Sequence, residues 1–233
     1  MNLTKPINGI FFDIGGTLNY DATGYWMFPK KSESLINLDG IYYVPIKRFN
    51  SAYTKCSNFL RANLPINTME EEYERYITFY TMLADYIPEF ELTKEKIKLI
   101  AHDKVYNVEN DIFFDDVPAA LKTLSGNYKL GLISDSWPSC EYKLKAADLY
   151  GYFTAVTFSC HLGVYKPDAK MFEHALEQMG LPAQETVLID DAKENLEAAK
   201  AFGIQPVWLN TKSEKKDDGF LTINSISEIL EYL

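Results

Sequence analysis

The feature that most constrains the fold is a regular alternation of short apolar runs with helix-like segments in the second half of the chain. The apolar runs predict strands and the intervening segments predict helices, with strands at 128–133, 153–158, 186–189 and 206–209 and helices at 138–147, 169–179 and 192–202. Strands joined through helices pair in parallel by right-handed crossovers. We therefore predict an α/β fold built on a doubly wound parallel sheet.

A further apolar run near the start of the chain ends in a carboxylate. Residues 10–18 read Ile-Phe-Phe-Asp-Ile-Gly-Gly-Thr-Leu, and the first half of this run is typical of a strand buried on both faces. Asp13 then lies at the mouth of that strand, followed by two glycines that allow a sharp turn. Thr17 offers a hydroxyl and a backbone N–H group. We assign this strand, residues 7–13, to the same sheet as the later strands.

The stretch between this first strand and the later ones has a different pattern. Residues 19–45 mix Gly, Pro and aromatic residues and predict a loop or flap, with a possible short strand at 41–44. From 45 to 107 apolar residues recur at three- and four-residue steps, which predicts three helices. Thr68 and Glu71 form a plausible capping box at the start of the second helix. The predicted domains are an α/β core of residues 1–18 and 112–233 and a helical domain of residues 19–111.

The remaining segments complete the predicted core. They are a helix at 117–124 with proline in its first turn, a charged linker at 211–219, an edge strand at 221–223 and a final helix at 225–232.

Charge, cysteine usage and hydropathy exclude several classes of function. The formal net charge of −10 disfavours nucleic acid and anionic membranes as partners, although a small basic pocket can still bind a phosphorylated metabolite. The three cysteines are widely spaced, which favours reduced thiols over disulfides or a zinc site. The sequence has neither an apolar run of membrane-spanning length nor a signal-type start. We expect a cytoplasmic protein that is a monomer or a homodimer.

Polar side chains follow the ends of the predicted strands. In doubly wound sheets, ligands bind beyond the carboxyl ends of the strands, at the point where the strand order reverses. The residues to collect at this edge are Ser134, Asp135 and Ser136 after one strand, Ser159 and Lys166 after the next, and Asp190 and Asp191 after a third. Together with Asp13 and Thr17, they predict a rim of carboxylates, hydroxyls and one lysine.

These motifs, in this order, resemble those of the haloacid dehalogenase superfamily of hydrolases. Its members show a hydrophobic strand with Asp-x-Asp-x-Thr, then a strand-terminal Ser or Thr, then a Lys, and then a strand-terminal acidic pair. The resemblance covers residues 7–18 and 112–230 and implies a Rossmann-like core. The helical stretch lies where that superfamily carries its first type of cap domain.

The rim residues suit phosphoryl chemistry with a magnesium ion, because Mg²⁺ prefers carboxylates, waters and phosphate oxygens as ligands. Asp13 and Asp191 supply carboxylates, with Asp190 as a second ligand or an outer partner. The resemblance favours Asp191 as the direct ligand, adds the backbone carbonyl of Gly15, and implies a covalent phosphate on Asp13 that water later hydrolyses.

The other predicted roles concern the phosphoryl group itself. Lys166 places a compact positive charge against Asp13 and the phosphoryl oxygens, and Ser134 adds a hydroxyl donor. We count Lys166 and Ser134 as catalytic together with Asp13. The predicted phosphate-binding residues are Gly16, Thr17, Ser134, Asp135 and Lys166.

One position departs from the family pattern. Phosphatases of this superfamily carry a second Asp two residues after the nucleophile, where it protonates the leaving alcohol, whereas this chain has Gly15. Positioned acid–base groups contribute about 10²- to 10⁴-fold in rate. Hydrolysis then needs leaving groups that require little protonation, or a donor from elsewhere. The candidate donors are Asp21, Asp135, Tyr42 and Tyr43.

Two other readings stay open at this point. The chain can be a weakly active or inactive sensor that binds a phosphorylated ligand, or it can cleave carbon–phosphorus or carbon–halogen bonds. Phosphonate cleavage needs a lysine outside the core for a Schiff base, and the candidates are Lys30, Lys31 and Lys47. The dehalogenases work without metal, so the acidic pair argues against them. Trp26 and Tyr42 are the residues of the helical domain that we expect to face the site.

Overall fold

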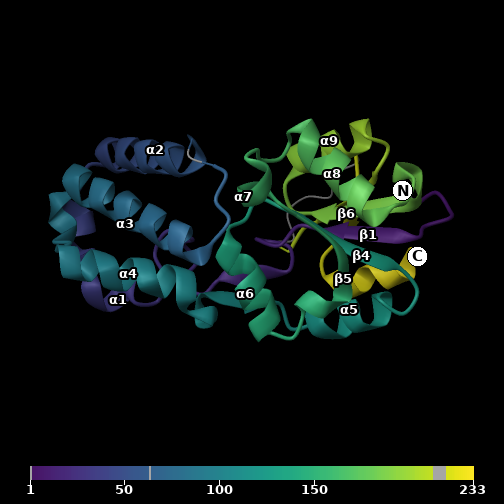
Figure 1. Ribbon diagram of the computed structural model, residues 1–233, viewed down its shortest axis with the longest axis horizontal. Helices are drawn as coiled ribbons and strands as arrows, with labels where there is room; N and C mark the ends of the chain where they lie inside the picture. The colour runs from purple at the N-terminus through teal and green to yellow at the C-terminus, as the bar shows by residue number, and fades with distance from the viewer. Residues whose placement is uncertain (1, 63, 212–218) are drawn as a thin grey trace. The chain divides into compact units, whose positions relative to one another are not determined.

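The computed structural model describes residues 2–62, 64–211 and 219–233. The chain forms two compact units (Figure 1). Unit 1 comprises residues 1–20, 113–136 and 140–233, and unit 2 comprises residues 21–112 and 137–139. We describe each unit by itself.

Unit 1 contains a six-stranded sheet in which every neighbouring pair of strands is parallel. Its spatial order is β5-β4-β1-β6-β7-β8. The strands are β1 (Gly9–Phe12), β4 (Lys129–Ser134), β5 (Phe153–Phe158), β6 (Thr186–Asp190), β7 (Gln205–Leu209) and β8 (Leu221–Ile223). The chain adds strands to one side of β1 and then to the other, so the order reverses between β1 and β6. This is the doubly wound sheet that the sequence predicts.

Helices cover both faces of this sheet. They are α5 (Val117–Leu124), α6 (Pro138–Ala146), α7 (Ser159–Leu162), α8 (Ala169–Met179) and α9 (Lys193–Ala201), with short 3₁₀ turns η4 (Tyr150–Tyr152), η5 (Ala183–Glu185) and η6 (Ile226–Glu231). Figure 1 shows α8 and α9 on one face and α5 on the other. Between α8, α9 and the sheet lies a core that includes Phe11, Phe172 and Leu188, all fully buried.

The packing of this core depends on a glycine in β4. A Cβ atom at Gly131 would lie 2.8 Å from two ring carbons of Phe11 and 2.8 Å from the terminal methyl of Met179. Real Cβ atoms do not approach other carbons so closely, because protein interiors are already close-packed. Gly131 therefore lets the aromatic ring on β1 lie against the backbone of β4, which is its direct neighbour.

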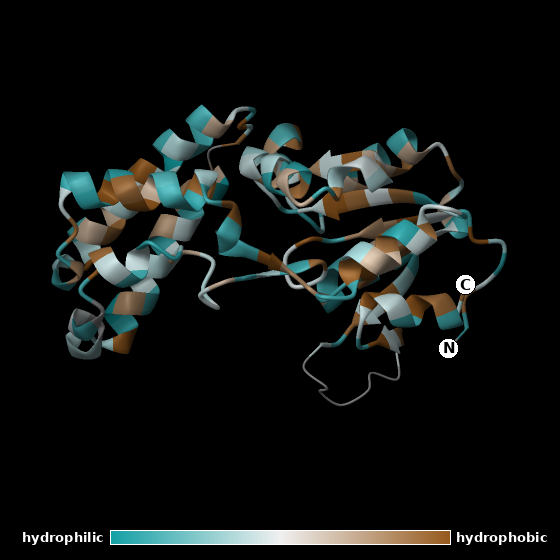
Figure 2. Cartoon of the chain, turned by 90° about the horizontal axis from the view of Figure 1, so that it is seen from below, coloured by the Kyte–Doolittle hydropathy of each residue, from teal (hydrophilic) through white to brown (hydrophobic). Residues whose placement is uncertain are grey.

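Unit 2 is helical. Its elements are α1 (Ser32–Leu35), α2 (Ile46–Ala62), α3 (Met69–Tyr86) and α4 (Lys94–Tyr106), with 3₁₀ segments η1 (Leu38–Tyr43), η2 (Pro88–Phe90) and η3 (Val108–Asn110). The core of this unit is rich in aromatic residues and includes the buried Tyr76, Phe79 and Tyr80. In Figure 2 its helices change between brown and teal along their length, as expected for helices with one apolar face.

The predicted capping box at the start of α3 is confirmed. The Thr68 hydroxyl accepts a hydrogen bond from the Glu71 backbone N–H group at 3.1 Å, and the Glu71 carboxylate accepts one from the Thr68 N–H group at 3.1 Å. These two contacts satisfy N–H groups that have no partner within the helix.

Some predicted elements differ from the structure. Residues 41–44 do not form a strand, because η1 occupies Leu38–Tyr43 and the Asn37 side chain accepts a hydrogen bond from Gly40 N at 3.2 Å. The segment 225–232 forms the 3₁₀ turn η6 in place of an α-helix, and Ser227 there bonds to Asp116. The predicted linker at 211–219 falls, apart from its two ends, outside the described residues.

The chain passes between the units through two short strands, of which the first lies in the stretch 19–45 predicted as a loop or flap and the second was not predicted. β2 (Asn19–Asp21) and β3 (Asp111–Phe113) pair with each other in a two-stranded sheet. A second excursion, residues 137–139, groups with unit 2 because Trp137 packs against Tyr76 and Ser139 binds Glu72. The predicted domain limits do not include this excursion, since it depends on contacts between residues far apart in the sequence.

Among the described helices we find no candidate for a membrane-spanning segment.

Candidate functional site

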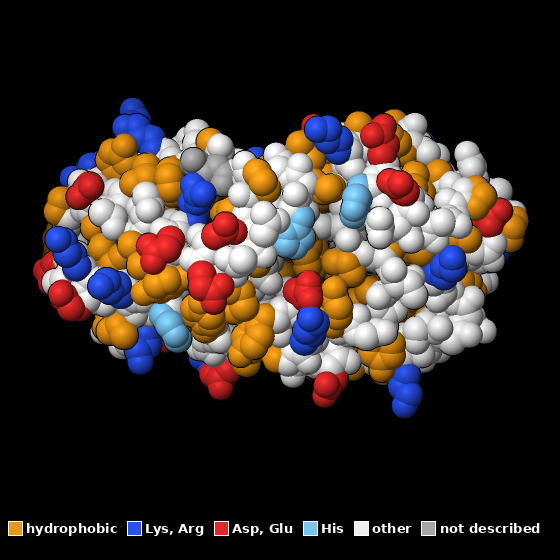
Figure 3. Space-filling view, viewed as in Figure 1, with side chains coloured by type: hydrophobic (Ala, Val, Ile, Leu, Met, Phe, Trp, Pro, Cys, Tyr) orange, Lys and Arg blue, Asp and Glu red, His pale blue; other side chains and the backbone are white. Residues whose placement is uncertain are grey.

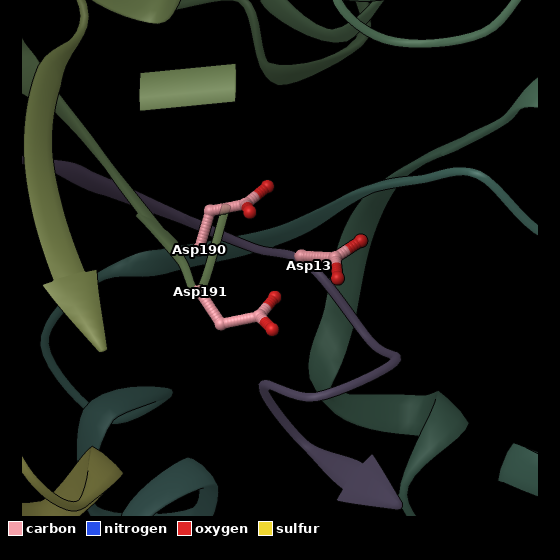
Figure 4. Close-up of side chains that lie close together, drawn as sticks. All are labelled: Asp13, Asp190 and Asp191. Carbon is pink, nitrogen blue, oxygen red and sulfur yellow. The ribbon is translucent and has the colours of Figure 1, made fainter. Parts of the chain in front are cut away.

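Three carboxylates meet at the point where the strand order reverses. Asp13 directly follows β1, Asp190 is the last residue of β6, and Asp191 comes next in the chain (Figure 4). One ligand oxygen from each lies within 4.8 Å of those of the other two. Because β1 and β6 are parallel neighbours, their carboxyl ends bring these side chains to the same edge of the sheet.

A buried lysine joins two of these carboxylates. The Lys166 ammonium nitrogen lies 2.8 Å from Asp13 Oδ1 and 2.7 Å from Asp190 Oδ2, and its side chain is only 2% exposed. The lysine backbone is held as well, because Lys166 N donates a hydrogen bond to Asp135 Oδ1 at 2.8 Å. The structure thus brings together four of the residues that the sequence places on the rim.

Burial and charge shift the pKa values of this cluster. Burial lowers the pKa of the Lys166 ammonium, but the charges and hydrogen bonds of Asp13 and Asp190 outweigh that effect and hold this pKa above its usual value. Burial, together with the neighbouring charge of Asp13, raises the pKa of the Asp190 carboxyl to about 7, and the contact with Lys166 opposes this rise. The lysine is therefore a permanent cation near neutral pH.

Both carboxylate oxygens of Asp190 accept hydrogen bonds from other residues of the protein. Besides Lys166, it accepts hydrogen bonds from Ala192 N at 2.8 Å and from Asn195 Nδ2 at 3.1 and 3.0 Å. A carboxylate offers about four lone-pair positions, so these four bonds use its accepting capacity. Asp191, in contrast, has an exposed side chain, and its backbone carbonyl accepts a bond from Trp208 Nε1 at 3.0 Å.

The turn after β1 is closed by its own backbone bonds. Gly16 N donates to Asn19 O at 2.8 Å, and Thr17 N donates to Ile14 O at 3.1 Å. The Thr17 N–H group is therefore engaged within the turn, whereas the sequence predicts it as a donor for a ligand. The Thr17 hydroxyl is different, because its oxygen is fully buried and has no hydrogen-bond partner among the described residues. A bound anion at this position would supply one.

The two glycines of this turn have different roles. Gly16 has a φ of +81°, and a Cβ atom there would lie 2.5 Å from Asp191 Oδ2. Only glycine fits this left-handed conformation and this close approach. Gly15 has an ordinary φ, and a Cβ atom there would meet nothing within 4 Å. The position at which the family pattern carries a second Asp is therefore open space.

Ser159, to which the sequence analysis gave no role, supports the loop after β4. Ser134, the last residue of β4, is 2% exposed. Two residues later, Ser136 N donates to Ser159 Oγ at 3.1 Å, and the Ser159 hydroxyl donates to Ser136 O at 3.3 Å. Ser159 follows β5, and the sequence analysis placed it on the rim for that reason, but without a partner or a role. Asn195 and Trp208 had no comparable signal.

The remaining sequence candidates lie in unit 2. Asp21 forms an ion pair of 3.7 Å with Lys104, and Lys30 pairs with Glu109 at 2.7 Å. The side chains of Tyr42 and Tyr43, in contrast, are largely exposed, and Trp26 packs against the core of this unit.

The donor set of the rim suits a hard divalent cation. Asp13, Asp190 and Asp191 each offer a carboxylate oxygen, and a hard divalent cation prefers oxygen ligands of this kind. The unpartnered Thr17 hydroxyl adds a group that suits an anion next to such a cation. On the face shown in Figure 3, Lys and Arg side chains are scattered among acidic ones.

Comparisons with known proteins identify the family of this chain. A family model described as haloacid dehalogenase-like hydrolase matches residues 7–203. Pyrimidine 5'-nucleotidase YjjG of Escherichia coli (strain K12) is 30% identical over 119 residues, which cover 48% of this chain and 53% of that protein. Glyceraldehyde 3-phosphate phosphatase of Methanothermobacter thermautotrophicus is 25% identical over 242 residues, which cover 97% of this chain and 100% of that protein.

A solved structure shows the same fold. The structure of a HAD phosphatase from Thermococcus onnurineus aligns with a TM-score of 0.64 at 18% identity and covers 97% of both chains. The chain thus spans about half the length of the first relative named above and the whole length of the second.

Proposed function

Since this chain belongs to the haloacid dehalogenase-like hydrolase family, we propose that it is a Mg²⁺-dependent phosphohydrolase that acts through Asp13 on a small phosphorylated compound. The observation that carries the proposal is the buried contact of Lys166 with both Asp13 and Asp190, beside the exposed carboxylate of Asp191. A relative that is a glyceraldehyde 3-phosphate phosphatase supports a phosphate ester as substrate.

Asp13, Asp191 and the backbone carbonyl of Gly15 are the groups that would hold the metal. Mg²⁺ bound there would neutralise the charge of the phosphoryl group and of the attacking carboxylate. Asp190 acts in our proposal as an outer partner, because its oxygens already accept bonds from Lys166, Ala192 and Asn195. Its part is to hold Lys166 in place.

The phosphoryl group is bound by three donors in this proposal. The Lys166 ammonium, the Thr17 hydroxyl and the Ser134 hydroxyl each offer an N–H or O–H group, and Gly16 allows the backbone to approach closely. Asp135 contributes indirectly, since its carboxylate accepts a bond from Lys166 N. Such preorganised donors stabilise charge where it develops in the transition state.

The reaction then runs in two displacements. One oxygen of Asp13, Oδ1, is held by Lys166, and we assign Oδ2 as the nucleophile. Oδ2 attacks phosphorus, the bond from phosphorus to the ester oxygen breaks, and the alcohol leaves as its anion. Water next attacks phosphorus and the bond from phosphorus to Oδ2 breaks, which releases inorganic phosphate and restores the Asp13 carboxylate, and the proton that water loses passes through solvent to the alcohol anion.

The leaving group decides the rate in this mechanism. Gly15 has no side chain of its own to protonate the departing oxygen, and among the described residues nothing lies within 4 Å of the place that its Cβ would occupy. Substrates whose leaving groups are stable as anions, such as acyl phosphates and aryl phosphates, should therefore react faster than alkyl phosphates.

The same glycine favours a second candidate function, a sensor that binds a phosphorylated ligand without rapid turnover. Bond cleavage of other kinds has less support. The contact with Glu109 raises the pKa of the exposed Lys30, which keeps it charged and unsuited to form a Schiff base. The cluster of Asp13, Asp190 and Asp191 also argues against carbon–halogen cleavage, because a dehalogenation that works without a metal does not require three carboxylates at one site.

Turnover of acetyl phosphate and 4-nitrophenyl phosphate, measured with Mg²⁺ and again with EDTA, tests the proposal. We expect Mg²⁺-dependent release of phosphate that Asp13→Asn abolishes and that Asp115→Asn, an exposed carboxylate of the same unit, leaves within twofold. Binding of inorganic phosphate in calorimetry without turnover would establish the sensor in its place. Turnover that survives in Asp13→Asn would overturn the role of Asp13.

A further inference from the structure

The peptide group that joins Asp191 to Ala192 is held at both of its polar ends. Its carbonyl oxygen, which belongs to Asp191, accepts a hydrogen bond from Trp208 Nε1 at 3.0 Å. Its N–H group, which belongs to Ala192, donates to Asp190 Oδ1 at 2.8 Å. Because a peptide group is planar, these two bonds together fix the plane in which the Cα atom of Asp191 lies.

The donor of the first bond lies on the strand beside β6. β7 pairs in parallel with β6, and Trp208 is the register partner of Asp190. Neighbouring strands of a sheet lie about 4.8 Å apart. The indole of Trp208 therefore starts level with Asp190 and reaches one residue further along β6, to the turn that leads into α9.

The indole itself has a fixed place. Trp208 is 6% exposed and belongs to the core cluster that also contains Leu196 and Ala199 of α9. Lys193 Nζ lies over its ring, 4.1 Å from the ring centroid, in a cation–π contact. A side chain packed in a core has few alternative rotamers, because protein interiors are close-packed. The direction of the Trp208 N–H group is thus set before any ligand binds.

The carboxylate of Asp191 lies against the turn after β1. A Cβ atom at Gly16 would be 2.5 Å from Asp191 Oδ2 and 2.8 Å from Asp191 Cγ. One ligand oxygen of Asp191 also lies within 4.8 Å of those of Asp13 and Asp190. A displacement of the Asp191 main chain would therefore change the separation between its carboxylate and that of Asp13.

This separation matters for a small dication. Mg²⁺ requires near-ideal octahedral geometry, with ligand oxygens about 2.0–2.1 Å from the ion. Groups that orient a metal ligand commonly change metal affinity about 10- to 100-fold when they are removed. The Trp208 bond acts on the main chain of Asp191 and not on its carboxylate, so we expect an effect near the lower end of this range.

We propose that Trp208 is a positioning residue of the divalent-cation site, whose indole N–H group holds the main chain of Asp191 and thereby the spacing between the carboxylates of Asp191 and Asp13. The inference rests on the proposed function only in taking these two carboxylates as ligands of Mg²⁺. All three residues belong to unit 1.

Calorimetric titration of the full chain with Mg²⁺ alone tests this role without turnover. Trp208→Phe keeps an apolar aromatic ring and removes the N–H donor. Trp26→Phe is the matched control, because it also removes an indole donor, which bonds Tyr53 Oη at 3.2 Å in unit 2. We expect Trp208→Phe to raise the Kd for Mg²⁺ at least fivefold and the control to leave it within twofold. Equal Kd values in Trp208→Phe and the unchanged protein would overturn the inference.

The dependence of turnover on Mg²⁺ concentration separates positioning from general damage to the core. With acetyl phosphate as substrate, we expect Trp208→Phe to raise the Mg²⁺ concentration for half-maximal rate at least fivefold. Its kcat at saturating Mg²⁺ should stay within twofold of the unchanged protein. A kcat that remains low at saturating Mg²⁺, with an unchanged half-maximal concentration, would contradict the positioning role.

Fluorescence provides a measurement that does not depend on the folding of Trp208→Phe. The chain has three tryptophans, so the double variant Trp26→Phe/Trp137→Phe retains only Trp208. A dication bound by Asp191 alters the electric field at an indole that is bonded to the same residue. We expect Mg²⁺ to change the emission of this variant with the Kd found by calorimetry, and Asp191→Asn to abolish the change. Constant emission at saturating Mg²⁺ would refute the inference.

The same titrations distinguish this inference from the proposed function. Weaker Mg²⁺ binding in Trp208→Phe, together with no turnover of acetyl phosphate by the unchanged protein, would overturn the phosphohydrolase and support the role of Trp208. Mg²⁺-dependent turnover with equal Kd values in the two proteins would leave the phosphohydrolase intact and remove the role of Trp208. If the unchanged protein binds no Mg²⁺, both proposals are wrong.

Discussion

The ammonium nitrogen of Lys166 lies 2.8 Å from Asp13 Oδ1, although 153 residues separate the two in the sequence. The parallel sheet brings them together, because the segments that carry them both follow the carboxyl ends of strands. The same ammonium contacts Asp190 at 2.7 Å, so a single buried cation balances two buried carboxylates. This balance is the basis of the first prediction.

Replacing Lys166 by methionine should destabilise the protein by about 3–5 kcal/mol at pH 7 in EDTA, because two buried carboxylates lose their cation. The pKa of Asp190, already raised by burial, should rise further in the variant. The folded variant then binds more protons than its unfolded chain, so its stability should increase as the pH falls from 7 to 5. Urea unfolding at both pH values measures this effect. Lys122→Met, an exposed lysine of the same unit, is the control, and equal losses in the two variants would contradict the prediction.

Gly15→Asp should raise turnover of an alkyl phosphate such as glycerol 2-phosphate by at least tenfold. The new side chain has open space and an ordinary backbone conformation, and it supplies the missing acid for a poor leaving group. Acetyl phosphate, whose leaving group needs little protonation, should gain less than threefold. Gly16→Ala is the matched variant, and it should lose most activity because its φ is +81° and its Cβ would meet Asp191. An unchanged rate for both substrates in Gly15→Asp would show that the missing carboxylate does not limit the reaction.

Ser159→Ala should cost about 1–2 kcal/mol of stability and lower kcat, because Ser136 N loses its acceptor and the loop that carries Ser134 loosens. Ser125→Ala removes an exposed hydroxyl that bonds Lys122 O, and it should change stability by less than about 0.5 kcal/mol. Urea unfolding and kcat for acetyl phosphate provide the two measurements. A full kcat in Ser159→Ala would mean that this hydroxyl does not position the loop.

Glu72→Ala should destabilise unit 2 by about 2–4 kcal/mol. The Glu72 carboxylate is buried and accepts hydrogen bonds from Ser139 N at 2.8 Å and from the Ser139 hydroxyl at 2.7 Å, so its loss leaves two buried donors. Glu72→Gln keeps an acceptor oxygen and should cost less. Glu74→Ala, an exposed residue on the same helix, is the control. Thermal unfolding compares the variants, and equal melting temperatures for Glu72→Ala and Glu74→Ala would refute the prediction.

Stability should fall as the pH rises from 9 to 11. Burial raises the pKa of the Cys56 thiol from 9.0 to about 11, and burial also holds the pKa values of the Tyr76 and Tyr80 phenols well above their usual range. Above pH 9 the unfolded chain releases these protons while the folded protein retains them, so unfolding becomes easier. Urea unfolding at several pH values should give a shallower decline for Cys56→Ala than for the unchanged protein. Cys140→Ala is the control, and parallel declines in all three proteins would contradict the assignment.

The sequence predicted most of the α/β unit because its signals are local. A strand buried on both faces shows an uninterrupted apolar run, and a helix shows apolar residues at three- and four-residue steps. Thus β5, β8 and α8 have the predicted bounds, and α6 and α9 differ by one residue at one or both ends. The strand predicted at 41–44 is wrong, because strand propensity is a weak signal in a run of four residues and the turn closed by Asn37 and Gly40 places them in a 3₁₀ segment.

Much of the rim was also predictable, since side chains that follow parallel strands must meet at one edge of the sheet. The contact of Lys166 with Asp13 is of this kind. The sequence did not show that Ser159, Asn195 and Trp208 hold residues of the rim and of the loop after β4 in place. Each does so through a hydrogen bond to a residue that is not adjacent in the chain.

By itself the sequence determined the order of strands and helices and the chemical character of the rim, because both depend on residues that are close together in the chain. The tertiary structure decided that the oxygens of Asp190 are already bonded while the side chain of Asp191 is exposed. It also decided that aromatic residues of unit 2 enclose a cavity with the unpartnered hydroxyl of Ser32 in its lining. The physical reason is that hydrogen-bond saturation and enclosed volume depend on how distant segments pack, which a pattern of residue types does not specify.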